Sequence, residues 1–480
     1  MRSAIKSILF VLITLIIGAK LIDIINYKDM GGGGGWQRFY QMEKEDADVF
    51  FVGSSRAHCT IDHGYLWENY GMAAYTMSAG SQKLDSSYYF VEEILRTKQP
   101  KVIAVEVSMV SGGELKNGDE DVYRNSLGMA WSGNLWNFAN YFADNRDMDS
   151  TWRNSVFIKI PIIHTRYKEL TREDFYDELP FMRGYRGSFD IDPFERPESE
   201  NNFDVSEIHP DKLAMLEKIV ETTKKSNVRL LFFVAPYHLS EEEQMNFNAV
   251  AEFAADNDVD FINFNHLYNE IDLDFSTDLR DVSHVNNYGA KKVTEYIADF
   301  LVLKYEIPDK RGLKGYELWE QNARYLQNKT VTHELEQAVD INDYFTKLKN
   351  YQEGKLVILA LTGNHTALGD VYLESLLQMG ITQEEYSEGG AWIIKDGVIV
   401  KHLSGQEYSL CFPIQNGEIH LESDITQYEG NYSGELTMIV NGVDYHKITN
   451  GVNIIVYDES LNQLIDAAGD DVYLGLEMTR

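Results

Sequence analysis

Short apolar runs alternate with helix-length amphipathic segments between residues 46 and 305, and this alternation restricts the fold more than any other feature. The apolar runs are 49–52, 73–77, 102–107, 228–235 and 260–264, and the segments predicted as helices are 64–70, 86–98, 208–226, 240–256 and 287–304. Strands separated by helices of this length pair in parallel, and helices cover both faces of their sheet. We therefore predict an α/β domain over residues 46–305.

The first apolar run stops at Gly53-Ser54-Ser55. A strand that ends in such a turn places the following residues at the carboxyl edge of the sheet, where open α/β folds bind their substrates. Ser55 is therefore our candidate nucleophile. It needs a neighbouring base, because a hydroxyl is a poor nucleophile at neutral pH.

A base and its partner occur before the last predicted helix, at His284 and Asp281. Their spacing lets the carboxylate accept a hydrogen bond from one imidazole nitrogen while the other nitrogen points toward a nucleophile. The alternative is that Asp281, Ser283 or Asn286 caps the helix and His284 lies on its first turn. The presence of a strand-Gly-Ser-Ser turn in the same domain favours the catalytic interpretation.

These two segments resemble the first and last motif blocks of the SGNH (GDSL-like) hydrolases, over about residues 46–305. Ser55 matches the nucleophile and Asp281-Val282-Ser283-His284 matches the last block; the choice of Ser55 over Ser54 rests on position in the block. The resemblance implies a flavodoxin-like sheet, a Ser-His-Asp triad and an oxyanion hole formed by the N–H groups of Ser55 and a second-block glycine. Gly80 is the nearest match for that glycine, with Ser78 as the competing position.

The chain departs from this family at the third block, where an asparagine ordinarily donates to the oxyanion and Glu106 and Ser108 stand here. Loss of one such donor costs roughly 3 kcal/mol of transition-state stabilisation in a protease, so we expect low activity toward simple esters. The Gly-Ser-Ser-Arg form, the missing asparagine and an N-terminal anchor resemble the DltD-like D-alanyl transfer proteins of teichoic acids and the anchored acetyltransferases of exported polysaccharides. Such proteins commonly work beside a membrane-bound O-acyltransferase.

Residues 109–205 interrupt the alternation with a polar and aromatic insertion. It leaves the sheet beside the predicted site, so it could form a lid or a substrate groove; the alternative is a packing excursion with buried aromatic residues. Arg56 is expected to bind substrate. His58 and His63 are expected to lie on the surface or line the site, because both fall where the helix after Ser55 should begin. A metal role is not expected for them, since no third ligand lies nearby at metal spacing. We expect no metal and no cofactor.

The N-terminus combines Arg2 and Lys6 with a mostly apolar run from residue 7 to residue 25, in which Lys20 and Asp23 are the two charged residues. Its length is about that of a membrane span, and the positive charges place the N-terminus inside. We predict an uncleaved single-pass anchor over 1–30 in the cell membrane, with the rest of the chain extracytoplasmic; a cleaved signal is the alternative. Residues 31–45, which are rich in glycine, are expected to form a flexible linker.

The 480-residue chain carries 43 Lys and Arg against 76 Asp and Glu, a formal charge of -33. Such a surface repels phosphate backbones, so nucleic-acid binding is not expected. The chain has two cysteines, Cys59 and Cys411, which excludes a disulfide framework.

Residues 306–333 are expected to form a linker to a smaller α+β domain over 334–480, in which Asp-Gly and Asn-Gly turns between short apolar runs predict hairpins. We expect no clustered ligands there. The segments 354–360, 390–394, 450–458 and 464–466 resemble the interleukin-like EMT inducer (ILEI) domain, with its two halves in reverse order, which suggests a circular permutation. The resemblance implies a carbohydrate-binding or protein-binding module, in which Asn364, His365 and Asn453 could line a sugar site; a structural cap is the alternative.

These features predict a bacterial extracytoplasmic serine esterase or O-acyltransferase that acts on acyl groups of a cell-envelope polysaccharide or teichoic-acid-like polymer. Two alternatives belong to other classes. In one, the fold is catalytically weak or inactive and only binds glycan; in the other, the protein is a scaffold for a membrane-bound O-acyltransferase.

Overall fold

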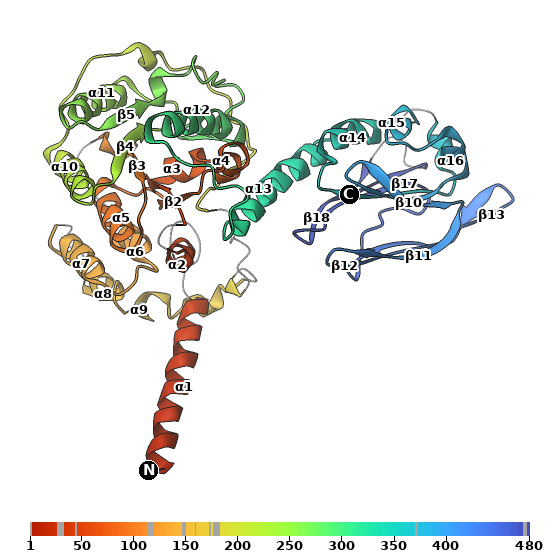
Figure 1. The fold of residues 1–480 in the computed structure, drawn as a ribbon, viewed down its shortest axis with the longest axis horizontal. Helices are drawn as coiled ribbons and strands as arrows, with labels where there is room; N and C mark the ends of the chain where they lie inside the picture. The colour runs from red at the N-terminus through yellow and green to blue at the C-terminus, as the bar shows by residue number, and fades with distance from the viewer. Residues whose placement is uncertain are drawn as a thin grey trace. The chain divides into compact units, whose positions relative to one another are not determined.

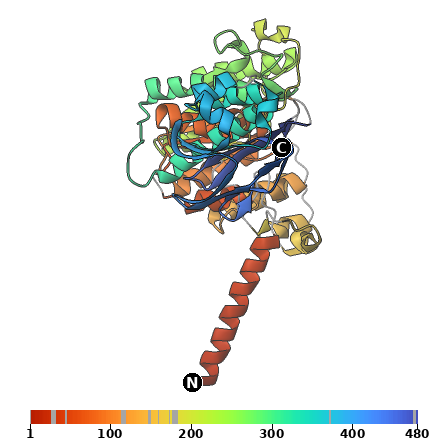
Figure 2. The same ribbon diagram turned by 90° about the vertical axis from the view of Figure 1, so that its right-hand side faces the viewer.

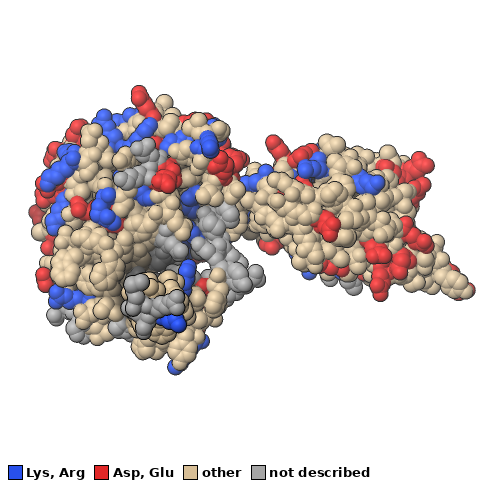
Figure 3. All heavy atoms as spheres, turned by 60° about the horizontal axis from the view of Figure 1, so that its bottom comes forward, with Lys and Arg blue, Asp and Glu red and all other residues tan. Residues whose placement is uncertain are grey.

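The computed structural model describes residues 2–25, 33–43, 46–112, 115, 119–145, 150–158, 160–171, 174–175, 183–369, 373–473 and 478–480. The chain forms two compact units, an N-terminal unit Met1–Ala323 and a C-terminal unit Arg324–Arg480. On the visible face in Figure 3, acidic and basic side chains are interspersed over the N-terminal unit, and acidic side chains predominate on the C-terminal unit.

The N-terminal unit is built on a parallel five-stranded sheet, as the alternation predicts (Figure 1). Its strands are β1 (Val49–Gly53), β2 (Ala74–Ser78), β3 (Val102–Glu106), β4 (Arg229–Val234) and β5 (Asp260–Asn263). They lie in the order β2-β1-β3-β4-β5, and every adjacent pair is parallel. This is the flavodoxin-like order of doubly wound sheets, in which the topological switch lies between β1 and β3.

Helices pack on the sheet in two groups. One group contains α3 (Ser55–Thr60), α4 (His63–Tyr70) and α12 (Asn287–Tyr305), and the other contains α5 (Leu84–Thr97) and α10 (Pro210–Lys225). The remaining crossover helix is α11 (Glu241–Asp256), which begins with a capping box formed by Ser240 and Glu243. The strands β1, β2 and β3 are buried along their whole length because helices cover both faces.

The N-terminal apolar run forms α1 (Arg2–Ile25). Within the part of the chain that the structure describes, Ile5–Ile22 is one helical stretch long and apolar enough to cross a membrane, with a mean hydropathy of 2.3 and none of it buried. A signal sequence has the same character. The end of α1 contacts the unit, since Ile22 and Ile25 pack against a small cluster formed by Tyr123, Leu127 and Ile163.

The linker predicted over 31–45 is wrong for its described central part, which forms α2 (Gly33–Gln41). Trp36 and Phe39 lie one turn apart on this helix and are both fully buried. Trp36 packs 4.6 Å from the Phe90 ring and donates a hydrogen bond to the Asn125 carbonyl oxygen at 3.1 Å. The free energy gained by burying the Trp36 and Phe39 rings offsets the loss of backbone entropy that the glycines undergo when they join a helix.

The insertion is largely helical where the structure describes it. Its helices are η1 (Ser108–Val110), α6 (Asp119–Ser126), α7 (Gly133–Asn145), α8 (Ser150–Ser155), α9 (Ile160–Ile163), η2 (Arg166–Lys168) and η4 (Glu198–Asn201). Trp131 and Trp136 are mostly exposed, whereas Tyr185 is buried. Neither expectation holds for all the aromatic residues, because buried and exposed rings occur along the same segment: Phe138 and Phe142 of α7 are fully buried.

Residues 306–333, expected to be a linker, include most of α13 (Glu317–Glu336). The prediction of a linker failed because the segment is mostly polar in sequence, yet α13 buries several of its side chains, including Trp319 and Asn328. Trp319 is 2% exposed and lies under the Arg183 guanidinium, and the Asn328 amide donates to Asp458 Oδ2 at 3.0 Å.

The C-terminal unit has helices α14 (Ile341–Leu348), η6 (Lys349–Tyr351), η7 (His365–Leu368), α15 (Leu373–Gln378) and α16 (Gln383–Glu388). A six-stranded antiparallel sheet has the order β10-β9-β8-β17-β18-β19. Its strands are β8 (Leu356–Thr362), β9 (Gly390–Lys395), β10 (Val398–Ser404), β17 (Gly451–Asp458), β18 (Gln463–Asp471) and β19 (Met478–Thr479). A four-stranded antiparallel sheet contains β11 (Glu407–Ile414), β12 (Gly417–Asp424), β15 (Leu436–Val440) and β16 (Val443–Asp444).

These elements make three layers, with the six-stranded sheet between helices and the four-stranded sheet (Figures 1 and 2). Alternation along β8 explains this arrangement: Val357, Leu359 and Leu361 belong to the core under the helices, whereas Leu356 and Ile358 belong to the core between the sheets. A separate hairpin joins β13 (Thr426–Tyr428) to β14 (Asn431–Ser433).

Candidate active site

Ser55 lies where the chain passes from β1 to α3, at the carboxyl edge of the parallel sheet. The preceding residue, Ser54, is the N-cap of α3 and accepts a hydrogen bond from the Arg56 N–H. Gly53 lets β1 approach β3 closely, since a Cβ at this position would lie 2.6 Å from the Glu106 Cβ. The turn therefore presents Ser55 at the edge beside the topological switch.

His284 joins Ser55 to Asp281. Its Nε2 lies 2.8 Å from Ser55 Oγ, and its Nδ1 lies 2.8 Å from Asp281 Oδ1. Asp281 and His284 face each other across a short hairpin of β6 (Leu279–Asp281) and β7 (His284–Val285). The helix cap is supplied by Asn286, whose side chain accepts from the N–H groups of Tyr288 and Gly289. Asp281 is therefore not the cap of α12, and the structure brings the three predicted residues together in one hydrogen-bonded row.

The surroundings of His284 favour a neutral imidazole. Burial lowers its pKa, and the positive charges of Arg280 and Arg56 lower it further, against the raising effect of Asp281. For Asp281, burial acts to raise the pKa, but hydrogen bonds from the Ser283 N–H and from His284 outweigh it, so the pKa is lowered. A carboxylate beside a neutral imidazole is the protonation state that a general base requires.

Arg56, predicted to bind substrate, is held inside the site by three contacts. Its Nη1 donates to Ser108 Oγ at 3.0 Å, its Nε donates to the Ser283 carbonyl oxygen at 3.3 Å, and its guanidinium lies 3.7 Å over the Tyr237 ring. These contacts connect α3 to the end of β3 and to the hairpin that carries His284. The arrangement fixes the position of the side chain, which remains partly exposed.

Gly80 lies in the turn after β2, at the same edge of the sheet, because Ser78 pairs with Gly53 in the register. A Cβ on Gly80 would meet nothing within 4 Å, so the space beside it is open. Ser78, the competing position, is buried and shares a hydrogen bond of 2.9 Å with His58 Nδ1. The structure thus leaves Gly80 as the candidate that faces open space.

Glu106 is a buried carboxylate that replaces the expected amide at the end of β3. Its Oε2 accepts from Ser54 Oγ at 3.1 Å and its Oε1 accepts from the Ser108 N–H at 2.9 Å. Burial raises its pKa, although the Arg56 charge and the hydrogen bonds act to lower it. Because the Ser54 hydroxyl is buried and committed to Glu106, Ser55 is the serine whose hydroxyl meets the base.

His58 and His63, expected at the surface or lining the site, are both internal, with 5% and 1% exposure. His63 Nε2 lies 2.9 Å from Thr76 Oγ1, and burial lowers the pKa of His63 to about 3. The sequence alone did not show which face of each helix the histidines occupy. In the structure, α3 and α4 direct both side chains toward β2. They are structural residues of the helix-sheet interface.

The last part of the insertion braces the site, which the sequence did not predict. The Arg186 N–H donates to the His58 carbonyl oxygen at 2.7 Å, and the Asn287 N–H donates to the Ser188 carbonyl oxygen at 2.8 Å. Asn286 Nδ2 also donates to the Asp190 carbonyl oxygen at 3.1 Å. This segment therefore joins α3 to the start of α12. Because it is irregular and polar, no sequence periodicity marks it.

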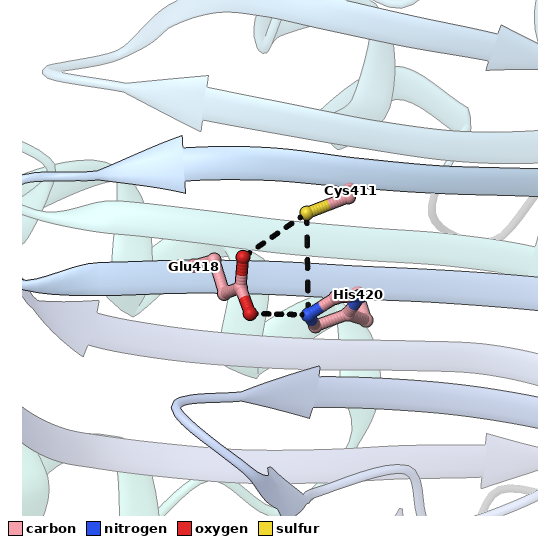
Figure 4. A group of neighbouring side chains, drawn as sticks. All are labelled: Cys411, Glu418 and His420. Atoms are coloured by element: carbon pink, nitrogen blue, oxygen red, sulfur yellow. Dashed lines mark hydrogen bonds and ion pairs between the residues drawn. The ribbon is translucent and has the colours of Figure 1, made fainter.

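Two of the three C-terminal residues proposed to line a sugar site, His365 and Asn453, are buried, whereas Asn364 is partly exposed. His365 is 2% exposed and shares a hydrogen bond with the Tyr386 carbonyl oxygen. Asn453 is 1% exposed, and its Oδ1 accepts from the Lys447 and Ile448 N–H groups. Both side chains satisfy internal backbone groups. The expectation that this region lacks clustered ligands is also wrong, since Cys411, Glu418 and His420 lie together (Figure 4).

The strand order and the row Ser55–His284–Asp281 together define the N-terminal unit as a hydrolase-like α/β unit. No family model matches the chain, and no curated protein matches it. Among solved structures, the chain is similar to a "putative acylhydrolase" from Bacteroides fragilis, at 10% identity and a TM-score of 0.29, over 58% of this chain and 100% of that chain.

Proposed function

We propose that the protein is an extracytoplasmic, membrane-tethered serine esterase or O-acyltransferase of the SGNH type. Its substrate is an acylated cell-envelope polysaccharide or teichoic-acid-like polymer. The observation that carries the proposal is the 2.8 Å contact between Ser55 Oγ and His284 Nε2, with Asp281 on the other imidazole nitrogen.

In the proposed mechanism, Ser55 Oγ attacks the acyl carbonyl carbon and His284 Nε2 takes the hydroxyl proton. Asp281 holds the Nδ1–H and stabilises the imidazolium that forms. The N–H groups of Ser55 and Gly80 donate to the oxyanion. His284 then returns its proton to the leaving alcohol, and an acyl-enzyme remains. Attack on the acyl-enzyme by water completes hydrolysis, and attack by a sugar hydroxyl completes transfer.

The contacts of α1 support an anchor that is retained in the mature protein. Ile22 and Ile25 pack against residues of α6 and α9, and Arg166 Nη1 donates to the Ile25 carbonyl oxygen at 3.1 Å. A signal peptide that is cleaved has no need of such contacts with the folded unit. A tether of this kind would hold the site beside the membrane, within reach of a membrane-bound O-acyltransferase.

A second candidate is a catalytically weak or inactive glycan-binding protein or scaffold. The observation in its favour is Glu106, which stands where the resembling family has an oxyanion-donating asparagine and whose two oxygens accept hydrogen bonds from the Ser54 hydroxyl and the Ser108 N–H. In this case the Ser55–His284 contact would persist as a structural feature, and the phenotype would survive the Ser55→Ala substitution.

Labelling of the full-length protein in detergent with a fluorophosphonate probe tests the proposal. We expect covalent labelling that is lost in Ser55→Ala and His284→Ala, whereas Ser54→Ala, a change of the adjacent hydroxyl, retains labelling. Labelling that survives His284→Ala would refute the triad. Comparison of the acyl content of wall polymers between wild type and Ser55→Ala then separates an enzyme from a scaffold, because a scaffold predicts equal acyl content.

A further inference from the structure

Cys411, Glu418 and His420 gather on the outer face of the four-stranded sheet of the C-terminal unit (Figure 4). Cys411 on β11 lies directly opposite His420 on β12 in the antiparallel register. Glu418 lies two residues before His420, so both side chains project from the same face of β12. Ile419 and Leu421 point to the other face and belong to the core between the two sheets.

The donor atoms of the three side chains converge. His420 Nε2 lies 2.8 Å from Glu418 Oε1, Cys411 Sγ lies 3.3 Å from Glu418 Oε2, and Cys411 Sγ lies 4.0 Å from His420 Nε2. One and the same imidazole nitrogen faces both the thiol and the carboxylate. In a proton relay, by contrast, the nucleophile and the carboxylate contact different nitrogens, as they do at His284. The convergence therefore fits chelation of one ion and does not fit a thiol nucleophile with its base.

The distances match the requirements of a small transition-metal ion. Tetrahedral zinc with bonds of about 2.3 Å to sulfur and about 2.0–2.2 Å to nitrogen and oxygen separates its ligand atoms by roughly 3.5 Å. The contacts between these three side chains, from 2.8 to 4.0 Å, bracket that value. A thiolate with an imidazole selects zinc and related ions over magnesium and calcium, which prefer oxygen ligands alone.

We propose that Cys411, Glu418 and His420 form a binding site for a borderline divalent metal ion such as Zn²⁺, with three protein ligands and one open position. The His420 and Glu418 side chains are 45% and 56% exposed, so water or an external ligand can reach the fourth position. The site lies outside both apolar cores of the unit. The ion is therefore exchangeable, and the C-terminal unit folds without it.

The test uses full-length protein in detergent with a non-thiol reductant, titrated with Zn²⁺ alone in a calorimeter and with Co²⁺ alone in a spectrophotometer. We expect about one metal ion per chain and a thiolate-to-cobalt charge-transfer band. Cys411→Ser should abolish the band. His420→Ala and Glu418→Gln should each weaken Zn²⁺ binding by roughly tenfold or more, because loss of a residue that only supports a metal ligand already lowers metal affinity by about 10–100-fold.

His446→Ala is the matched control, because His446 is a surface imidazole of the same unit that pairs with Asp444. It should leave the stoichiometry, the affinity and the charge-transfer band unchanged. Absence of a charge-transfer band in the wild type, or equal Zn²⁺ affinity in wild type, Cys411→Ser and His420→Ala, would overturn the proposal. Because the three side chains face solvent, the variants should keep the wild-type circular dichroism spectrum, and a loss of binding then reports on the ligands.

Discussion

His284 Nε2 lies 2.8 Å from Ser55 Oγ, although 229 positions separate the two residues in the chain. The contact exists because β1 and the hairpin before α12 both end at the carboxyl edge of the parallel sheet. Asp281 completes the row from within the hairpin, and Arg56 fastens α3 to the same hairpin through the Ser283 carbonyl oxygen. The site is therefore assembled from the two ends of the predicted α/β domain, and each of its parts can be tested by a separate substitution.

Asp281→Asn should lower kcat for an activated aryl ester by about 10⁴-fold, the size of this effect in a well-studied triad. An amide cannot fix the Nδ1–H tautomer of His284 as the carboxylate does. Steady-state kinetics and the rate of fluorophosphonate labelling measure the effect. Asp274→Asn removes a carboxylate of the loop before β6 that bonds Ser276 instead of His284, and it should leave kcat unchanged. Equal kcat in Asp281→Asn and wild type would contradict the assigned role.

Arg280→Gln should move the acid limb of kcat/KM to higher pH. The base must be neutral, so activity rises as pH increases through the pKa of His284. Arg280 lowers that pKa, and its removal raises the pKa and delays the rise. Arg56→Gln should shift the limb in the same direction by less, since its charge has the smaller effect.

The acid limb of the wild type should itself lie below pH 6.5, the ordinary pKa of histidine, because burial lowers the pKa of His284. A pH profile of kcat/KM for the wild type and both arginine variants checks these statements. A limb that stays in place or moves to lower pH in Arg280→Gln would be inconsistent with the electrostatic account.

Gly80→Pro and Gly80→Ala separate the role of the Gly80 N–H from the role of its small size. Alanine keeps the N–H and adds a methyl group into open space, so kcat should change little. Proline removes the N–H, and loss of one oxyanion donor should lower kcat by roughly 10²–10³-fold. Equal kinetics in the two variants would exclude Gly80 as a donor, provided that both melt at similar temperatures.

Glu106→Gln should change thermal stability in a pH-dependent way. Burial raises the pKa of Glu106 in the folded protein above its usual 4.5, so the folded state holds this proton more tightly than the unfolded state does. As pH rises above 4.5, ionisation therefore favours unfolding of the wild type, and glutamine escapes this effect. The melting temperature of Glu106→Gln relative to wild type should increase with pH until Glu106 is ionised in the folded state, and a difference that is constant between pH 4 and pH 8 would contradict the prediction.

Sequence periodicity predicted much of the parallel sheet and its helices, because buried strands and amphipathic helices require regular patterns of apolar residues. The strands from residue 49 to residue 263 and the helices around them lie close to their predicted ranges. Where the pattern of apolar residues is weak, prediction failed. The helix α2 begins with a run of glycines, which is typical of a flexible linker, and α13 lies in a polar stretch that was also predicted to be a linker.

The sequence by itself determined which residue types could form a nucleophile, a base and its partner, since only those side chains supply that chemistry. Tertiary structure decided which of these side chains contact one another. The Ser54 hydroxyl donates to Glu106, and the Asn286 side chain caps α12. Ser55 is therefore the serine that contacts His284. Tertiary structure also decided that Cys411 faces His420, a contact that depends on the register of two strands. The periodicity of neighbouring residues is enough to predict helices and strands. Contacts between residues far apart in the chain depend instead on how whole helices and strands pack.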